Sequence, residues 1–138
     1  MKNTYATILN LEKTDFGLLL FRLAISGLML THGIPKLITF FTSDEIQFAD
    51  PIGLGMVFSL GFAVFAEFIC SILVILGLGT RLAVLPLIAT MAVAALIVHW
   101  TDGFGRQELP LLYMSGYLLL YFSGAGRYSL DYFLLNKK

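Results

Sequence analysis

Four apolar stretches, each about as long as a membrane-spanning helix, constrain the fold of this chain more than any other feature. They cover roughly residues 16–40, 53–77, 81–100 and 108–124 of a sequence of 138 residues. A helix needs about 20 mostly apolar residues to cross the hydrocarbon core of a bilayer. Because only short connections separate the stretches, the sequence predicts an all-α integral membrane protein: an up-and-down four-helix bundle that forms a single domain over residues 1–138.

The composition excludes most alternatives to a membrane protein. Hydrophobic residues make up 58% of the chain and charged residues 13%. Soluble domains contain about 45–50% hydrophobic and about 25% charged residues. Nine basic and nine acidic side chains cancel, so we expect no nucleic-acid partner. A single cysteine, Cys70, rules out an internal disulfide and a structural zinc site. The first residues lack the apolar core of a signal peptide, so the spans themselves are expected to direct membrane insertion.

Basic residues next to the predicted spans indicate how the bundle is oriented, because cytoplasmic flanks carry an excess of lysine and arginine. One side of the bundle carries six such residues and the other side carries two: Lys2, Lys13, Arg81, Arg127, Lys137 and Lys138 against Lys36 and Arg106. The sequence therefore predicts that both termini are cytoplasmic.

Ionisable residues inside the predicted spans are candidates for function, because they are costly in a bilayer and normally face a partner. At about 100° per residue, Arg22, His32 and Lys36 project from the first span within roughly 80°. Gly33 lies in the same stripe and permits close approach of another helix. Glu67 lies near the middle of the second span. Either Arg22 or His32 could reach it. We expect Glu67 to be buried and coupled to Arg22, directly or through a neighbour, either as a structural ion pair or as a carboxylate that handles protons or a ligand.

A pocket is predicted in the outer half of the membrane. His99 ends the third span and Glu108 opens the fourth, at depths similar to that of Lys36. The predicted ligand-binding set is therefore His32, Lys36, Glu67, His99 and Glu108. The alternative is that the histidines are solvated at the interface and the carboxylates are structural. Neither haem nor a metal ion is predicted, because the histidines lack an HxxxH or ExxH spacing, and no residue is assigned a catalytic role.

The sequence GAGRYSLD, residues 124–131, is predicted to end the fourth span. Gly124 and Gly126 permit a tight turn that directs the tail along the membrane. Arg127 is expected to meet a lipid phosphate or the carboxylate of Asp131, four residues further on. With Arg81, these two residues form a predicted cytoplasmic motif, for which docking of a soluble redox partner is the alternative role.

Three blocks of the sequence resemble the DoxX family of small bacterial membrane proteins: RLAISGLMLTHGIPKL, AEFICSILVILGLGTRLAVLPLIATMAVAA and DGFGRQELPLLYMSGYLLLYFSGAGRYSLD. The resemblance runs from about residue 18 to residue 131. It implies a multi-pass protein of the bacterial cytoplasmic (inner) membrane. The family includes subunits of a thiosulfate:quinone oxidoreductase, so the resemblance also implies a link to quinone chemistry. The family motif maps onto Arg22, His32, Gly33, Lys36, Glu67, Arg81, Gly103, Phe104, Glu108, Gly124, Gly126, Arg127 and Asp131.

Three functions are compatible with this pattern. The first is a redox-associated subunit that binds a quinone or a similar lipophilic molecule, has no covalent cofactor, and receives electrons from a soluble or membrane partner. The second is a proton-coupled transporter or exporter of a small solute. Four short helices are few for a transporter, so we expect a homo-oligomer. The third is a scaffold for a partner complex, with purely structural polar residues.

Overall fold

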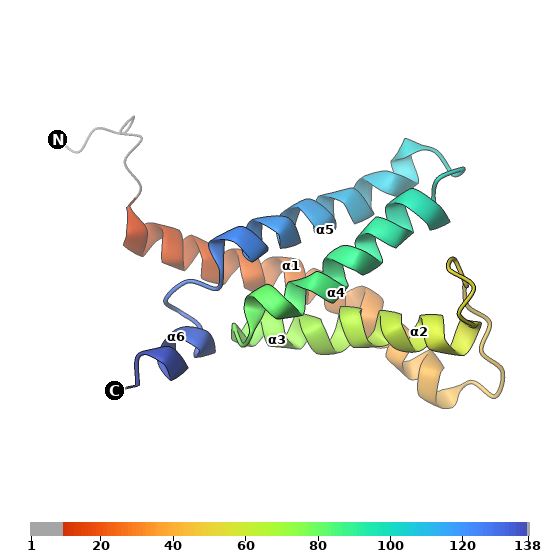
Figure 1. The fold of residues 1–138 in the computed structure, drawn as a ribbon, viewed down its shortest axis with the longest axis horizontal. Coiled ribbons are helices and arrows are strands. Elements are labelled where there is room, and N and C mark those ends of the chain that lie inside the picture. Colours follow the sequence, from red (N-terminus) through yellow and green to blue (C-terminus); the bar gives the residue numbers. More distant parts are fainter. Residues whose placement is uncertain (1–9, 138) are drawn as a thin grey trace.

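The protein is an antiparallel helical bundle. A computed structural model describes residues 10–137, and every regular element within them is a helix. These helices form four rods, which run up and down between the two ends of the bundle (Figure 1). The first rod is α1 (Leu11–Thr42), and the second consists of α2 (Met56–Val64), η1 (Phe65–Cys70) and α3 (Ser71–Leu76). The third rod consists of α4 (Thr80–Val93) and η2 (Ala94–Val98), and the fourth is α5 (Phe104–Ser123). A short helix, α6 (Leu130–Leu135), follows.

Within the described residues, three helical rods are long and apolar enough to cross a membrane: Leu11–Thr42, Met56–Leu76 and Thr80–Val98. They coincide with the first three predicted stretches, although α1 extends further at both ends. The fourth rod, α5, has 20 residues and begins at Phe104, so Arg106 and Glu108 make its first turns polar. The predicted all-α membrane bundle is confirmed.

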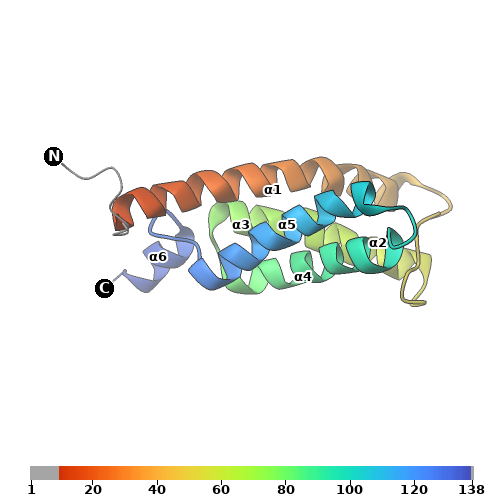
Figure 2. The same cartoon turned by 90° about the horizontal axis from the view of Figure 1, so that it is seen from above.

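The two ends of the bundle hold different parts of the chain. The start of α1, the turn between α3 and α4 and the helix α6 lie at one end, which we call the tail end (left in Figure 1 and Figure 2). The loop 43–55 and the turn 99–103 lie at the other, which we call the cavity end. Between the ends, α4 packs along α5, and α1 packs along the whole second rod.

Buried apolar side chains from all four rods form the core, among them Met29, Val74, Leu87 and Leu120. In a bilayer this packing gains van der Waals contact rather than release from water, because the lipid tails are as apolar as the side chains. Buried polar groups therefore decide how the rods fit together, and one of them lies at the tail end.

The second rod ends in a glycine turn. Gly77 adopts a φ of 69°; its N–H donates to the carbonyl of Val74 at 3.1 Å, and the N–H of Leu78 donates to that of Leu73 at 2.9 Å. These two bonds are those of a Schellman motif, which satisfies carbonyls left free at a helix end. A Cβ at position 77 would overlap Nη1 of Arg22, so glycine is required here for space as well as for conformation.

Arg22 is completely buried at the tail end. Its Nη2 donates to the backbone carbonyl of Tyr128 at 2.5 Å, and its Nη1 donates to that of Val74 at 3.5 Å. The guanidinium thus joins α1, α3 and the segment before α6. Arg22 and Glu67 are both buried, but the predicted ion pair between them is wrong, because Arg22 is directed to these carbonyls and Glu67 pairs with Lys36.

The tail is attached to the bundle by Asp131. Its carboxylate accepts hydrogen bonds from the backbone N–H groups of Gly79 at 2.7 Å and Thr80 at 3.2 Å. The first N–H groups of a helix have no partner within it and attract a negative charge, so Asp131 caps α4. The predicted contact between Asp131 and Arg127 is wrong, because these amides occupy the carboxylate; Nε of Arg127 lies 3.3 Å from Oδ2 of Asp15 instead.

The turn after α5 has the predicted glycine conformation. Gly124 and Gly126 have φ values of 76° and 77°. Arg81 donates from Nη2 to the carbonyl of Phe122 at 3.4 Å, which helps to satisfy the last turn of α5. Arg127 and Asp131 tie the tail to α1 and α4, and Arg81 joins α4 to the end of α5. Docking of a redox partner at these three residues stays a prediction.

Gly77 and Gly79 provide a matched test of the packing around Arg22. Both have positive φ values, 69° and 57°, but a Cβ would meet Arg22 only at position 77 and nothing within 4 Å at position 79. We expect Gly79→Ala to cost about 1–2 kcal/mol of unfolding free energy, which is the strain of a non-glycine residue in the left-handed region. Gly77→Ala should cost clearly more, because the buried guanidinium must move. Thermal unfolding in detergent compares them, and equal losses would contradict this packing.

Candidate ligand-binding site

Lys36 and Glu67 form an ion pair in the interior of the bundle. Nζ of Lys36 donates to the two carboxylate oxygens of Glu67 at 2.6 and 2.5 Å. The side chain of Glu67 is 2% exposed and that of Lys36 is 29% exposed. Helical side chains point back toward the helix N-terminus, so Lys36 reaches Glu67 over the position of Gly33. Each charge compensates the other, which a bilayer itself cannot do.

Helix α1 passes very close to η1 at Gly33. An ideal Cβ at this position would lie 2.7 Å from both the carbonyl carbon and the carbonyl oxygen of Glu67. At Gly27, on the same helix, such an atom would meet nothing within 4 Å. The close approach predicted at Gly33 is therefore confirmed, and it sets how deeply Lys36 enters the bundle.

The two segments that border the site are π-helical. Glu67 lies within η1, and η2 ends at Val98, directly before His99. A π-turn closes its hydrogen bond over one more residue than an α-turn. Such turns are rare overall, but they are often found at functional sites. Neither segment contains glycine or proline, so the residue pattern offered no signal for them.

A cavity of about 500 Å³ lies beside the ion pair at the cavity end. Its polar lining comes from Lys36, Ser59, Glu67, Thr90 and His99. The rest of the lining is apolar and comes from α2, α4, η2 and the loop 43–55. An apolar cleft with a few convergent polar groups is the usual form of a small-molecule site.

The structure brings three of the five predicted ligand-binding residues to this cavity. Lys36, Glu67 and His99 line it, whereas His32 and Glu108 do not. The ring of His32 packs edge-on against Tyr113 of α5, with ring centroids 5.9 Å apart, and Glu108 is exposed on α5. The prediction that these two residues line the pocket is therefore wrong. A similar depth in the membrane does not ensure that side chains on different helices point toward the same space.

The loop 43–55 forms a wall that the sequence analysis missed. Its lining residues are Phe48, Ala49, Pro51, Ile52 and Leu54. Asp50 holds the loop on α2: its carboxylate accepts hydrogen bonds from the N–H groups of Leu54 and Gly55, each at 2.9 Å, and from Oγ of Ser59 at 3.0 Å. These hydrogen bonds, of which the one from Gly55 has the largest effect, hold the pKa of the Asp50 carboxyl below its usual value. The attachment is therefore present at neutral pH and is lost only when Asp50 is protonated in acid.

His99 and Asp102 form a second polar pair at the cavity end. Nδ1 of His99 lies 2.8 Å from Oδ2 of Asp102, and Nη1 of Arg106 lies 3.5 Å from the same oxygen. The hydrogen bond with His99 and the charge of Arg106 hold the pKa of the Asp102 carboxyl below its usual value. Gln107 donates to the carbonyl oxygens of His99 at 3.1 Å and Trp100 at 3.3 Å. Asp102 was not among the predicted site residues, although its spacing of three residues from His99 was a signal.

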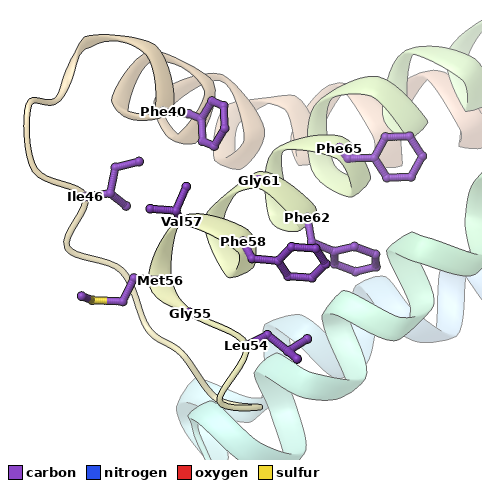
Figure 3. A pocket seen from close by; sticks show the side chains of 10 residues that line it. All are labelled: Phe40, Ile46, Leu54, Gly55, Met56, Val57, Phe58, Gly61, Phe62 and Phe65. Carbon is purple, nitrogen blue, oxygen red and sulfur yellow. The ribbon is translucent and has the colours of Figure 1, made fainter.

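A second groove, with apolar lining, lies next to the cavity, between the end of α1, the loop 43–55 and the start of the second rod (Figure 3). It measures about 640 Å³, and its lining includes Phe40, Ile46 and Val57. Phe58 and Phe62 line both spaces. Because its side chains offer no polar group to orient a ligand, the cavity beside the ion pair is the better candidate site.

The fold and the site define a helical membrane bundle with an interior ion pair and a cavity at one end. The sequence profile of the DoxX family matches residues 17–100, a range that includes Lys36, Glu67 and His99. An uncharacterized protein of Haemophilus influenzae (strain ATCC 51907 / DSM 11121 / KW20 / Rd) is 34% identical over 136 aligned residues, which cover 88% of this chain and 94% of that relative. The chain belongs to the DoxX family, as its motifs indicated. No solved structure matches it significantly.

The ion pair generates a double-mutant test. Lys36→Met leaves the buried carboxylate uncompensated, and Glu67→Gln leaves the ammonium without a counter-ion. Removing one partner of a buried pair costs about 3–5 kcal/mol, and we expect values near the lower limit because Lys36 is partly exposed. The double variant should lose less than the sum of the single losses. Thermal unfolding measures the cycle, with Lys13→Met, at an exposed position of α1, as the control. Additive losses would contradict the pair.

Proposed function

We propose that the protein binds a quinone or a similar lipophilic molecule in the cavity beside Lys36 and Glu67, as a redox-associated subunit whose partner supplies electrons. The observation that carries this proposal is a cavity of about 500 Å³ with apolar walls and a buried ion pair. The apolar lining suits a ring with an aliphatic tail. A quinone carbonyl accepts hydrogen bonds, and both the ammonium of Lys36 and a protonated His99 are donors.

Polar contacts must supply most of the selectivity of such a site. A lipophilic molecule enters from the bilayer, so its tail gains little free energy from leaving one apolar medium for another. A hydrogen bond to a charged group contributes about 1.5–3 kcal/mol, or roughly one to two orders of magnitude in affinity. Lys36, Glu67 and His99 are therefore the groups expected to select the head of the bound molecule.

Filling the cavity tests the proposal directly. Ala89 lines the cavity, whereas Leu85, one turn earlier on α4, does not. We expect Ala89→Phe to weaken binding of a benzoquinone with a decyl tail by about ten-fold or more, since lost contacts of about 1.4 kcal/mol suffice for that. Leu85→Phe should bind like the wild type. Quenching of Trp100, the only tryptophan of the chain and the neighbour of His99, measures saturable binding in lipid nanodiscs.

Two results would contradict the proposal. One is quenching by the wild type that rises without saturation, as partition into lipid alone would give. The other is equal affinity in Ala89→Phe and Leu85→Phe. His32→Ala is a further control, because His32 does not line the cavity and should leave the affinity unchanged.

We further propose that the tail end faces the cytoplasm of a bacterial inner membrane and that the cavity end faces the opposite side. In the sequence, six basic residues lie next to the spans on the tail-end side and two on the cavity-end side, and this asymmetry supports the proposed orientation. Alkaline phosphatase, which is active only outside the cytoplasm, should therefore be inactive when fused after Lys138, whereas green fluorescent protein at the same place should fluoresce. The reverse pattern would invert the orientation. A redox partner and a homo-oligomer belong to the same proposal, but ligand binding requires neither.

A further inference from the structure

The pair formed by His99 and Asp102 lies at the wall of the cavity, where His99 would contact a bound molecule. His99 is a lining residue, and its Nδ1 is engaged by Oδ2 of Asp102 at 2.8 Å. An imidazole that donates its Nδ1–H to a carboxylate is held in one tautomer, in which Nε2 carries a free lone pair. Nε2 is thus the ring nitrogen that remains for a bound molecule.

The turn that carries this pair is held in place by other bonds. Gln107 donates to the carbonyl oxygens of both His99 and Trp100, and the N–H of Asp102 donates to the carbonyl of His99 at 3.2 Å. The backbone conformation therefore does not depend on the contact between the two side chains. What that contact adds is control of the rotamer and the tautomer of the imidazole.

We propose that Asp102 is a positioning residue that fixes the tautomer of His99, and that Nε2 of His99 is a pH-dependent hydrogen-bonding group for the head of the molecule in the cavity. Neutral His99 accepts a hydrogen bond from a hydroxyl head. Protonated His99 donates one to a carbonyl head. This inference rests on the proposed function, because it concerns the same cavity, and it deepens it: the carbonyl and hydroxyl forms of one lipophilic ligand bind with opposite pH dependence.

Asp102 is the charged residue in direct contact with the imidazole of His99. Its Oδ2 lies 2.8 Å from Nδ1 of His99, and Nη1 of Arg106 lies 3.5 Å from the same oxygen. Lys36 and Glu67 line the same cavity but compensate each other as an ion pair. Glu108 is exposed on α5 and does not line the cavity. Asp102 is therefore the residue placed to fix the tautomer of the imidazole.

The first experiment needs no ligand. The full chain is labelled with ¹⁵N at histidine and studied by NMR in lipid nanodiscs. The chain contains two histidines, so His32→Gln leaves the signals of His99 alone. We expect neutral His99 to carry its proton on Nδ1. Adding Asp102→Asn should move the proton toward Nε2. A proton on Nε2 of neutral His99 before this change would overturn the inference.

The second experiment compares a benzoquinone with a decyl tail and its hydroquinone. Their affinities are measured by quenching of Trp100 from about pH 5 to about pH 8, the range in which histidine changes charge. We expect the affinity of the quinone to fall about ten-fold with rising pH and that of the hydroquinone to rise by a similar factor. In each case one hydrogen bond is lost or gained. His99→Gln should flatten both profiles, because an amide does not change charge. His32→Gln should change neither.

The outcomes separate the inference from the proposed function. Saturable binding with flat profiles, or flattening by His32→Gln as strong as by His99→Gln, overturns only the inference. Absence of saturable binding of both probes to the wild type overturns the proposed function and, with it, the role of Nε2 toward a ligand. Opposite profiles that disappear in His99→Gln establish the role of Nε2.

Discussion

The ion pair between Lys36 and Glu67 is the interaction on which the arrangement of the site depends. The interior of a bilayer offers neither water nor counter-ions, so a buried charge must be compensated within the chain. Because the two residues belong to different rods, compensating both charges fixes how α1 is placed along η1. Gly33 makes this placement possible by letting the backbones meet. The cavity then lies between the pair and the loop 43–55, with polar groups on one part of its lining and apolar walls on the rest.

The two ends of the bundle handle buried charge in different ways. At the tail end, Arg22 donates to two backbone carbonyls, and the neighbouring glycine turn leaves no free space. At the cavity end, charged side chains face each other and leave room beside them. The carbonyls of two packed segments cannot be rearranged without opening the bundle, whereas a lysine has several rotatable bonds. The tail end is therefore suited to holding the rods together, and the cavity end to accommodating a ligand.

The length and spacing of the apolar stretches made the fold predictable, because a bilayer permits few alternatives to closed helical bundles. The turns at Gly77, Gly124 and Gly126 were equally readable from their residue type. The partners of the charged residues were not. Helical periodicity gives the direction of a residue around its axis, but the reach of Arg22 and Lys36 depends on how each side chain lies along the helix.

Local spacing was misleading in a second case. Asp131, four residues after Arg127, was one of its two predicted partners, yet the free N–H groups at the start of α4 are the partners of that carboxylate. These groups lie far away in the sequence, and no rule of spacing points to them. The loop 43–55 was missed as a wall of the cavity because it follows no helical period, and the two π-helical segments have no glycine or proline to reveal them.

The bond between Arg22 and Tyr128 joins residues 106 positions apart, and this distance has a consequence for biosynthesis. Arg22 belongs to the first of the four rods, and the carbonyl of Tyr128 is made only after the fourth rod. Until then the guanidinium lacks this partner, so it is expected to stay near the water-exposed edge of the membrane, where a long side chain can reach headgroups. The tail end can therefore close only after all four rods have been synthesised.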